Sequence, residues 1–393
     1  MENFIYKNPT EIIFGRNCLH ALKDQLLKRG YRSALVLYGG SHCKVNGVLK
    51  QITTQLESCS ISCFVQGGIH PNPKLSEVEQ IVKNVKDDIV DVVLALGGGS
   101  VIDTAKAVAV CLAAPSVRLQ DILLGDQKIK RALDVGVIST IAGSGSESSC
   151  SMVITIDDGN LKRACDDEQL YPVFAILDPT LTFTLPYYQM VSGACDILMH
   201  AMERYFSPTD NTELIDSMCE GLMRVVLSSI EKSIKNPQDY EARANLMWAG
   251  SLCHNGLLGT GRKEDWACHR MEHELSGLFN VVHGAGLCAL WGSWAAYVRP
   301  YHPKRFASFA SQVMGIEEVN DDRCGTLGIQ ALVSFFKRVG MPVCITDLNV
   351  CIDEAIIQTM AQNCLLRSDS IGQLKRLSLQ DIKAIYRKAG KVE

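Results

Sequence analysis

Long hydrophobic runs and an excess of charge of either sign are both absent from this chain of 393 residues. Its apolar runs, such as Ala107–Ala114, fall well short of the roughly 18 residues that span a bilayer. The 39 basic and 43 acidic residues give a formal net charge of −4, which offers no broad field to a nucleic acid or an anionic membrane. The N-terminus also lacks the charged flank and apolar core of a signal peptide. We therefore expect neither nucleic acid nor membrane as a partner.

The Cys-x-x-Cys motif is also missing, although the chain has 16 cysteines spread from Cys18 to Cys364. Its absence argues against a zinc ribbon and against a thioredoxin-type redox pair. Most of these cysteines stand in apolar surroundings, which favours buried free thiols over a disulfide framework. The reducing cytoplasm is the compartment that this pattern predicts.

Apolar segments of strand length alternate with helical periodicity in the first half of the chain. This order favours a parallel sheet buried on both faces, with helices on both sides. After Asp178-Pro179 the pattern becomes amphipathic and helical. We therefore predict an α/β domain over residues 1–182 and an all-α domain over residues 183–393. The expected strands are 34–38, 61–65, 90–96, 135–140 and 173–177, and the expected helices are 48–56, 78–85, 213–228, 240–256, 303–314 and 324–339.

A strand that runs into three glycines and a helix start is the first candidate binding motif. Gly97, Gly98 and Gly99 would leave backbone amides open at a helix N-terminus, where the partial positive charge suits a pyrophosphate. Ser100 and Asp103 have the spacing of a capping box. A tight turn would also explain a glycine here, and the spacing is neither Gly-x-Gly-x-x-Gly nor a P-loop. We interpret the five residues as a nucleotide-phosphate site.

Two further loops follow predicted strands. Gly39, Gly40 and Ser41 come after the first strand, where many NAD-binding folds carry an acidic residue for the ribose 2′-hydroxyl. Because residues 39–44 include no acid, this loop predicts tolerance of NADP, although an ordinary polar turn would look the same. The second loop, Thr140 to Ser148, is rich in small hydroxyl residues, Ser144 among them, and is placed to close over a cofactor.

Aspartate and histidine recur at helical spacing in the second half. Asp196 and His200 are four residues apart, as are His269 and His273, and such pairs share one face of a helix. His283 follows ten residues later. A single histidine is more often a hydrogen-bonded core residue, and the i,i+4 pair also occurs on helix surfaces. One carboxylate with imidazoles nevertheless suits Zn²⁺ or Fe²⁺ and leaves a position for substrate.

Taken together, these segments resemble the iron-containing (group III) alcohol dehydrogenase family over nearly the whole chain. Trp266-Ala-Cys-His269 and Tyr38-Gly39-Gly40 are most similar to the branch of butanol dehydrogenases and NADPH-dependent aldehyde reductases. The other matching motifs are Asn8-Pro9-Thr10 with Phe14-Gly15, Pro71-Asn72-Pro73, Gly97-Gly98-Gly99-Ser100 with Asp103 and Lys106, Gly143 to Glu147, Asp178-Pro179, Asp196-x3-His200, and His269-x3-His273-x9-His283-Gly284.

The resemblance implies an N-terminal dinucleotide-binding domain, a helical C-terminal domain as in dehydroquinate synthase, and a cleft between them for cofactor and one metal. By position, it implies that the metal ligands are Asp196, His200, His269 and His283. It also implies that His273 lies near the nicotinamide without being a ligand, that Lys162 reaches the cofactor phosphates, and that Thr140 and Ser144 line the nucleotide. His42 departs from the branch, since a serine is usual at the place of the 2′-phosphate. A homodimer or larger homo-oligomer is the expected assembly.

The expected activity is the interconversion of primary alcohols and aldehydes, of butanol and butanal type, by hydride transfer with NADP(H), with NAD(H) as the possible alternative. A divalent cation would stabilise the developing alkoxide, and His273 is the candidate to pass the proton or, alternatively, a partner of a ligand. The rival activities are glycerol dehydrogenase-like oxidation with NAD and a dehydroquinate synthase-like cyclase. A non-catalytic metal or nucleotide sensor is the rival of another class.

Overall fold

The computed structural model describes residues 1–392, and the chain divides into two compact units. The α/β unit contains Lys7–Leu185 and Pro237–Asn255. The helical unit contains Met1–Tyr6, Pro186–Asn236 and the chain from Gly256 onward. Both units are therefore assembled from segments that are separated in the sequence.

A six-stranded parallel sheet forms the centre of the α/β unit, in the order β1-β8-β5-β4-β2-β3. The edge strands are β1 and β3, and β3 is partly exposed because only one neighbour covers it. A separate antiparallel hairpin pairs β6 with β7. The bounds are β1 (Glu11–Phe14), β2 (Ser33–Tyr38), β3 (Ser62–Gly67), β4 (Val92–Gly97), β5 (Asp134–Ser139), β6 (Ser151–Ile156), β7 (Leu161–Asp166) and β8 (Phe174–Leu177).

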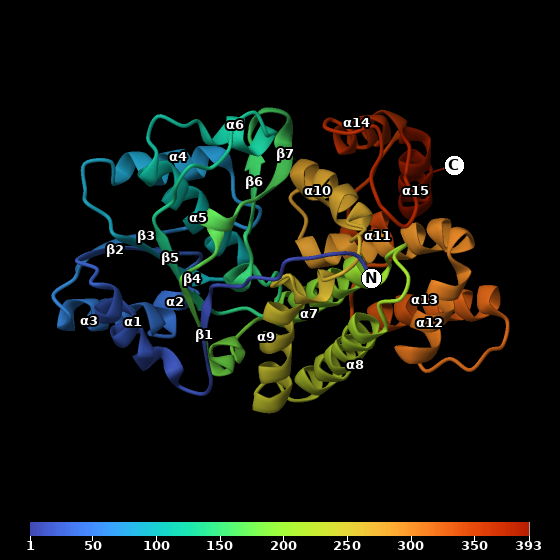
Figure 1. Cartoon of the computed structure of the whole chain (residues 1–393), viewed down its shortest axis with the longest axis horizontal. Coiled ribbons are helices and arrows are strands. Elements are labelled where there is room, and N and C mark those ends of the chain that lie inside the picture. Colours follow the sequence, from blue (N-terminus) through green and yellow to red (C-terminus); the bar gives the residue numbers. More distant parts are fainter. Residues whose placement is uncertain (393) are drawn as a thin grey trace. The chain divides into compact units, whose positions relative to one another are not determined.

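Side chains alternate across this sheet and build one apolar core on each face. Leu35 and Leu37 of β2 join the core under α4, α5 and α6, whereas Ala34 and Val36 join the core under α1 and α3. Figure 1 shows α4 and α6 on one side of the strands and α1 and α3 on the other. The helices are α1 (Ala21–Arg29), α2 (His42–Val45), α3 (Val48–Ser58), α4 (Leu75–Asn84), α5 (Gly99–Ala113), α6 (Leu119–Leu124) and α9 (Tyr240–His254).

The helical unit is built around buried aromatic rings. Phe206 stacks on Phe306 with ring centroids 4.5 Å apart, and both rings contact Trp294. Among residues 1–392, no helix combines the length and the apolar character needed to cross a membrane. The helices of this unit are α7 (Tyr187–Tyr205), α8 (Glu213–Lys235), α10 (Ala267–Phe279), α11 (His283–Val298), α12 (Pro303–Gln312), α13 (Asp321–Arg338), α14 (Glu354–Cys364) and α15 (Leu379–Gly390).

The predicted fold class, a parallel α/β domain followed by helices, is confirmed. The units nevertheless differ from a single cut at residue 182, because α9 packs in the α/β unit. Ser251 of α9 donates to the Glu147 carboxylate at 2.6 Å, and Arg16 lies over the Tyr240 ring. An amphipathic pattern shows that a helix has a buried face but not which unit buries it.

Candidate functional site

The first candidate region lies at the point where the strand order of the sheet reverses. The chain adds β3 on one side of β2 and then β4, β5 and β8 on the other side, so the order reverses between β2 and β4. The loops after β2 and β4 therefore leave the carboxyl edge of adjacent strands, where open α/β sheets bind ligands. Gly39-Gly40-Ser41 and Gly97-Gly98-Gly99 occupy these two loops.

The glycine triplet stands where side chains would collide with the neighbouring loop. A Cβ at Gly98 would lie 2.9 Å from the Ile141 side chain, and one at Gly99 would lie 2.4 Å from Ser144 Oγ. The structure thus brings two of the predicted cofactor loops against each other. Helix α5 starts at Gly99 with its amides at this place, as an anion site requires.

The predicted capping box at Ser100 and Asp103 is wrong. The N-cap of α5 is Gly98, no side chain caps it, and Ser100 lies inside the helix. Asp103 instead accepts hydrogen bonds from Ser146 Oγ at 2.6 Å and from the Val153 amide at 3.1 Å. Its spacing from Ser100 suggested a local bond, but its carboxylate is engaged by residues more than forty positions away.

Asp103 and the buried Lys106 together tie α5 to the loop that contains Ser144. Lys106 Nζ donates to the carbonyl oxygens of Ser146, Ser149 and Ser151 at 2.7–2.9 Å. Burial raises the pKa of Asp103 and lowers the pKa of Lys106 to about 8, and each charge opposes this shift in the other. The two residues thus position the loop from beneath.

The remaining predicted cofactor residues lie on loops of the same unit. Thr140 is buried, and its amide donates to the Gly97 carbonyl at 3.1 Å. Lys162 on β7 is also buried, and its Nζ donates to Asn72 Oδ1 at 2.9 Å in the Pro71-Asn72-Pro73 turn. Thr140 therefore joins the loop after β5 to the end of β4.

His42, the departure from the expected serine, is held by its own surroundings. Its Nε2 lies 2.7 Å from Thr184 Oγ1, and its Nδ1 lies 3.4 Å from Asn46 Nδ2. Lys44 on the same short helix, α2, is exposed. Its Nζ lies 5.3 Å from the centre of the Tyr38 ring, so Lys44 stands beside the loop Gly39-Gly40-Ser41 as an exposed cation.

The second candidate region is a cluster on three helices of the helical unit. Asp196 and His200 project from one face of α7, His269 from α10, and His283 from the first position of α11. Asp196, His200 and His269 are each at most 5% exposed. A Cβ on Gly284 would lie 2.0 Å from the Ser192 carbonyl oxygen, so α11 reaches the backbone of α7 only because this residue is glycine.

Three histidine nitrogens surround a single carboxylate oxygen of Asp196. Oδ1 lies 3.8 Å from His200 Nδ1, 3.8 Å from His269 Nε2 and 3.7 Å from His283 Nε2. These distances are too long for hydrogen bonds. They are close to the separation of two ligand atoms in a tetrahedral metal site, which is roughly 3.4 Å when each ligand lies 2.0–2.1 Å from the ion.

The donor atoms at the centre of this cluster pass a direct test of fit for a cation. Within residues 1–392, Asp196 Oδ1 and His269 Nε2 are buried and have no hydrogen-bond partner. A buried carboxylate oxygen without a partner costs free energy unless another group compensates it. One oxygen and imidazole nitrogens are a donor set for Zn²⁺ or Fe²⁺. The residues present therefore fit a divalent ion.

Two glutamates that the sequence analysis did not identify flank the histidines. Glu203 Oε1 lies 2.7 Å from His269 Nδ1, and Glu272 Oε2 is bonded to His283 Nδ1. Burial opposes protonation of His269, but Asp196 and Glu203 outweigh it and raise the pKa of His269 to about 9. Glu203 lies seven residues after Asp196 and Glu272 three after His269, spacings that place helical residues near the same face.

Trp266, which the sequence marked only as part of the Trp266-Ala-Cys-His269 motif, also lies at this cluster. It has a φ of +62°, which is unusual for a bulky side chain, and it precedes the first residue of α10. Its ring makes edge contacts with His200 at 5.8 Å and His269 at 5.1 Å between centroids. Trp266 therefore packs against two members of the cluster.

His273 lies beside the cluster and not at its centre. It is half-buried, one helical turn after His269, and its ring centroid is 5.6 Å from that of His283. Side-chain atoms of His273, Glu272 and His283 come within 4.8 Å of one another. This position suits a group that exchanges protons next to the Asp-His cluster.

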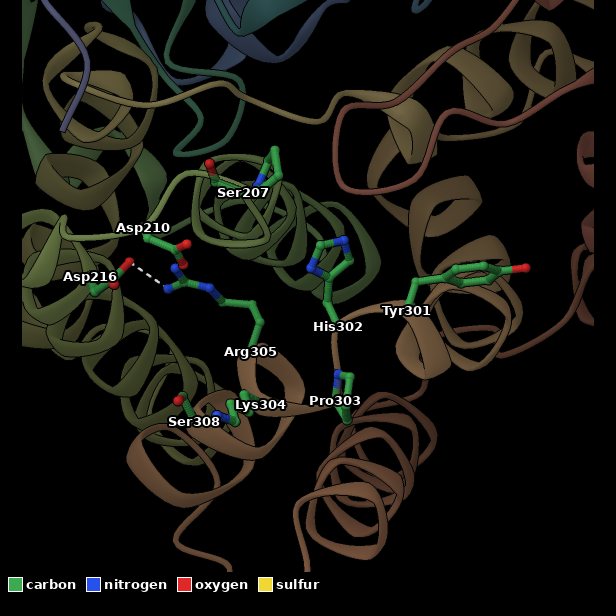
Figure 2. A pocket seen from close by; sticks show the side chains of 10 residues that line it. Ser207, Asp210, Asp216, Tyr301, His302, Pro303, Lys304, Arg305 and Ser308 are labelled. Carbon is green, nitrogen blue, oxygen red and sulfur yellow. Dashed lines mark ion pairs between the residues drawn. The ribbon is translucent and has the colours of Figure 1, made fainter.

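A cavity of about 470 Å³ in the helical unit is lined by none of these residues. Figure 2 shows Arg305 reaching Asp216 across this cavity, and the two groups form an ion pair at 2.8 Å. Asp216 is also bonded to the buried Arg262 at 2.7 Å. Asp216 therefore shares its one negative charge between Arg305 and Arg262.

An open parallel sheet with glycine loops at its switch point, joined to a helical unit with an Asp-His cluster, is the architecture of a metal-containing dehydrogenase. Residues 9–179 match the iron-containing alcohol dehydrogenase family, and residues 190–390 match the C-terminal part of the Fe-containing alcohol dehydrogenase family. The chain belongs to the iron-containing alcohol dehydrogenase family.

Similar proteins span the full length of the chain. NADH-dependent butanol dehydrogenase B of Clostridium acetobutylicum is 38% identical over 99% of this chain and 100% of the relative. The NADPH-dependent aldehyde reductase YqhD of Escherichia coli is 34% identical over 88% of this chain and 89% of the relative. The crystal structure of NADH-dependent butanol dehydrogenase A from Thermotoga maritima superposes with a TM-score of 0.94 at 36% identity and covers 99% of both chains.

These findings confirm the predicted family and its oxidoreductase class. The activity of the family on alcohols and aldehydes, with a nicotinamide cofactor, applies to this chain. The named relatives divide between NADH and NADPH.

Proposed function

We propose that this protein interconverts primary alcohols and aldehydes of butanol and butanal type by hydride transfer with NADP(H), at a site that holds one divalent ion, Fe²⁺ or Zn²⁺. The observation that carries the proposal is the spacing of three histidine nitrogens at 3.7–3.8 Å from one buried, unpartnered oxygen of Asp196. Free thiols, most of them buried, support the reducing cytoplasm as its compartment.

Asp196, His200, His269 and His283 would hold the ion. When ion and cofactor are bound, the ion would polarise the substrate oxygen and the nicotinamide would carry the hydride. Among the four ligands only the aspartate would carry a negative charge, so these ligands alone would not cancel the two positive charges of the ion. The protein adds a rigid frame, because the four side chains come from three packed helices.

His273 is the proposed group that moves the proton. Its imidazole is half-buried next to His283 and is therefore placed between the buried cluster and solvent. Histidine suits this task because its ordinary pKa lies near neutral pH. His273 is not one of the four predicted ligands.

The α/β unit is the proposed binding site of the nucleotide. The amides at the start of α5 would bind the pyrophosphate, with Gly97, Gly98 and Gly99 allowing close approach. The preference for NADP(H) is supported by the lack of an acidic residue at positions 39–44 and by the exposed Lys44. Because the named relatives include both NADH- and NADPH-dependent enzymes, only the residues of this loop support the preference.

The activity can be measured as the loss of NADPH absorbance with butanal. The account predicts turnover that a chelator abolishes and that Fe²⁺ or Zn²⁺ restores, because the ion supplies the charge that stabilises the alkoxide. Glycerol with NAD⁺ serves as the comparison substrate pair. Turnover of butanal that survives complete removal of metal would contradict the proposal.

A further inference from the structure

We propose that Glu203 and Glu272 are positioning residues that fix the ring orientation and tautomer of two metal-binding histidines, His269 and His283. The assignment rests on the proposed metal site. Neither glutamate would touch the ion or the substrate. Each would act on its histidine from the side opposite Asp196.

Glu203 holds His269 through a single oxygen. Its Oε1 accepts the His269 backbone N–H at 2.9 Å and lies 2.7 Å from Nδ1 of the same ring. The backbone bond fixes the carboxylate relative to the start of α10, and the ring bond then fixes the imidazole. With the proton on Nδ1, the lone pair of Nε2 is directed at Asp196 Oδ1, 3.8 Å away.

Glu272 holds His283 in the same way from the same helix as His269. Its Oε2 is bonded to His283 Nδ1, while its Oε1 accepts the Ser276 hydroxyl. Glu272 is fully buried, and both of its oxygens are engaged. The Nε2 of His283 then lies 3.7 Å from Asp196 Oδ1.

The two glutamate–histidine pairs have the same arrangement of ring nitrogens, which packing alone does not require. In both histidines Nδ1 is bonded to a carboxylate and Nε2 is directed at Oδ1 of Asp196, which is buried and has no hydrogen-bond partner among residues 1–392. A carboxylate that accepts from the distal N–H of a ligand histidine orients the ring and increases its basicity as a ligand. Glu203 and Glu272 are buried, a costly position for a carboxylate unless nearby positive charge compensates it.

A different arrangement would make Glu272 a ligand of a second ion, together with His273 and His283. Their atoms are close enough to form such a group. Glu272 Oε2 is already bonded to His283 Nδ1 without an ion, whereas the atoms around Asp196 Oδ1 stand 3.7–3.8 Å from it. We therefore assign Glu272 to the histidine and not to a metal.

The test is the affinity of the full-length, metal-free protein for Zn²⁺ and Co²⁺, measured by competition with a chromophoric chelator. Glu203→Ala and Glu272→Ala are expected to weaken binding about 10- to 100-fold. Glu203→Gln and Glu272→Gln keep an acceptor oxygen and are expected to recover most of this loss. The matched control is Glu274→Ala, which removes another buried glutamate of α10 that lies near Tyr386.

A second readout follows the tautomer itself. Proton NMR of the Co²⁺-loaded protein should show shifted Nδ1–H signals that exchange slowly with D₂O, because a buried carboxylate holds each proton. The signal of His269 should be lost or exchange quickly in Glu203→Ala, and that of His283 in Glu272→Ala. A role limited to packing would leave both signals in place. The glutamine variants keep the test valid if an alanine variant does not fold.

The outcomes separate the assignment from the proposed function. Unmodified protein that binds neither ion refutes the metal site and the assignment with it. One tightly bound ion whose affinity is unchanged in all four variants, or falls equally in Glu274→Ala, overturns the assignment alone. Two ions per chain, reduced to one by Glu272→Ala, would make Glu272 a ligand and also overturn it.

Discussion

Asp196 illustrates how much of the site depends on single atoms. Its Oδ1 is buried and faces three imidazoles at distances that a hydrogen bond would shorten and a shared ion would explain. The sequence could predict this residue because Asp-x-x-x-His places both side chains on one helical face. It could not predict Glu203 or Glu272 as partners, since a glutamate in a helix is usually exposed to solvent.

His273 provides the first prediction at this scale. His273→Ala is expected to keep one metal ion per chain while kcat falls on the order of 10²-fold or its pH profile changes, because the variant lacks a general acid or base. Metal analysis and steady-state kinetics on one preparation measure both. The control is His70→Ala, whose side chain is 83% exposed. Loss of the ion from His273→Ala would instead make His273 a ligand.

Glu147 provides a prediction on stability. Burial raises the pKa of Glu147 above its ordinary value of 4.5, although Ser251 and Lys106 oppose the shift. Folded protein therefore binds this proton more tightly than unfolded chain does. The stabilising contribution is complete below pH 4.5 and is lost as the pH rises through the folded pKa.

Glu147→Gln keeps an acceptor for Ser251 but does not ionise. The difference in free energy of unfolding, variant minus parent, is therefore expected to increase with pH from acidic toward neutral conditions. Urea unfolding of both proteins over this range measures the difference. A difference that stays constant or decreases with pH would show that Glu147 ionises at least as easily in the folded state as in the unfolded chain.

At the scale of elements, the loops after β2 and β4 meet at the reversal of strand order. Strand-length apolar segments predicted β2, β3, β4, β5 and β8 to within about two residues. The pattern did not identify β1, β6 or β7, which contain charged residues or lie at an edge or in a separate hairpin. Ser100 and Asp103 were misread because a capping box is a local pattern and Asp103 makes long-range bonds.

The loop after β2 provides a prediction on the cofactor. Unmodified protein should have a higher kcat/KM for NADPH than for NADH, and Gly39→Asp should lower this ratio about tenfold or more by placing a carboxylate near the 2′-phosphate. The substitution is tolerable, since a Cβ here would meet its nearest neighbours at 3.5 and 3.6 Å. Gly39→Asn is the control of equal shape without charge. Equal or better kcat/KM with NADH in the unmodified protein would refute the preference.

At the scale of the whole molecule, the chain forms two units that the sequence divides only approximately. The change from strands to helices after Asp178-Pro179 is visible in the sequence, and the structural boundary lies at Leu185 and Pro186. The return of α9 to the α/β unit is not visible, because it depends on contacts such as Ser251 with Glu147. The candidate site follows the same rule: the residue types were predictable and their mutual distances were not.

The most direct measurement of the central claim is metal content and turnover of His269→Ala and His283→Ala, determined on the same preparations as the unmodified protein. The account predicts that each variant loses most of its ion and its butanal reduction together, because each lacks one of four ligands, while circular dichroism shows a retained fold. If either variant keeps a full equivalent of metal and its turnover, the four-residue site is wrong.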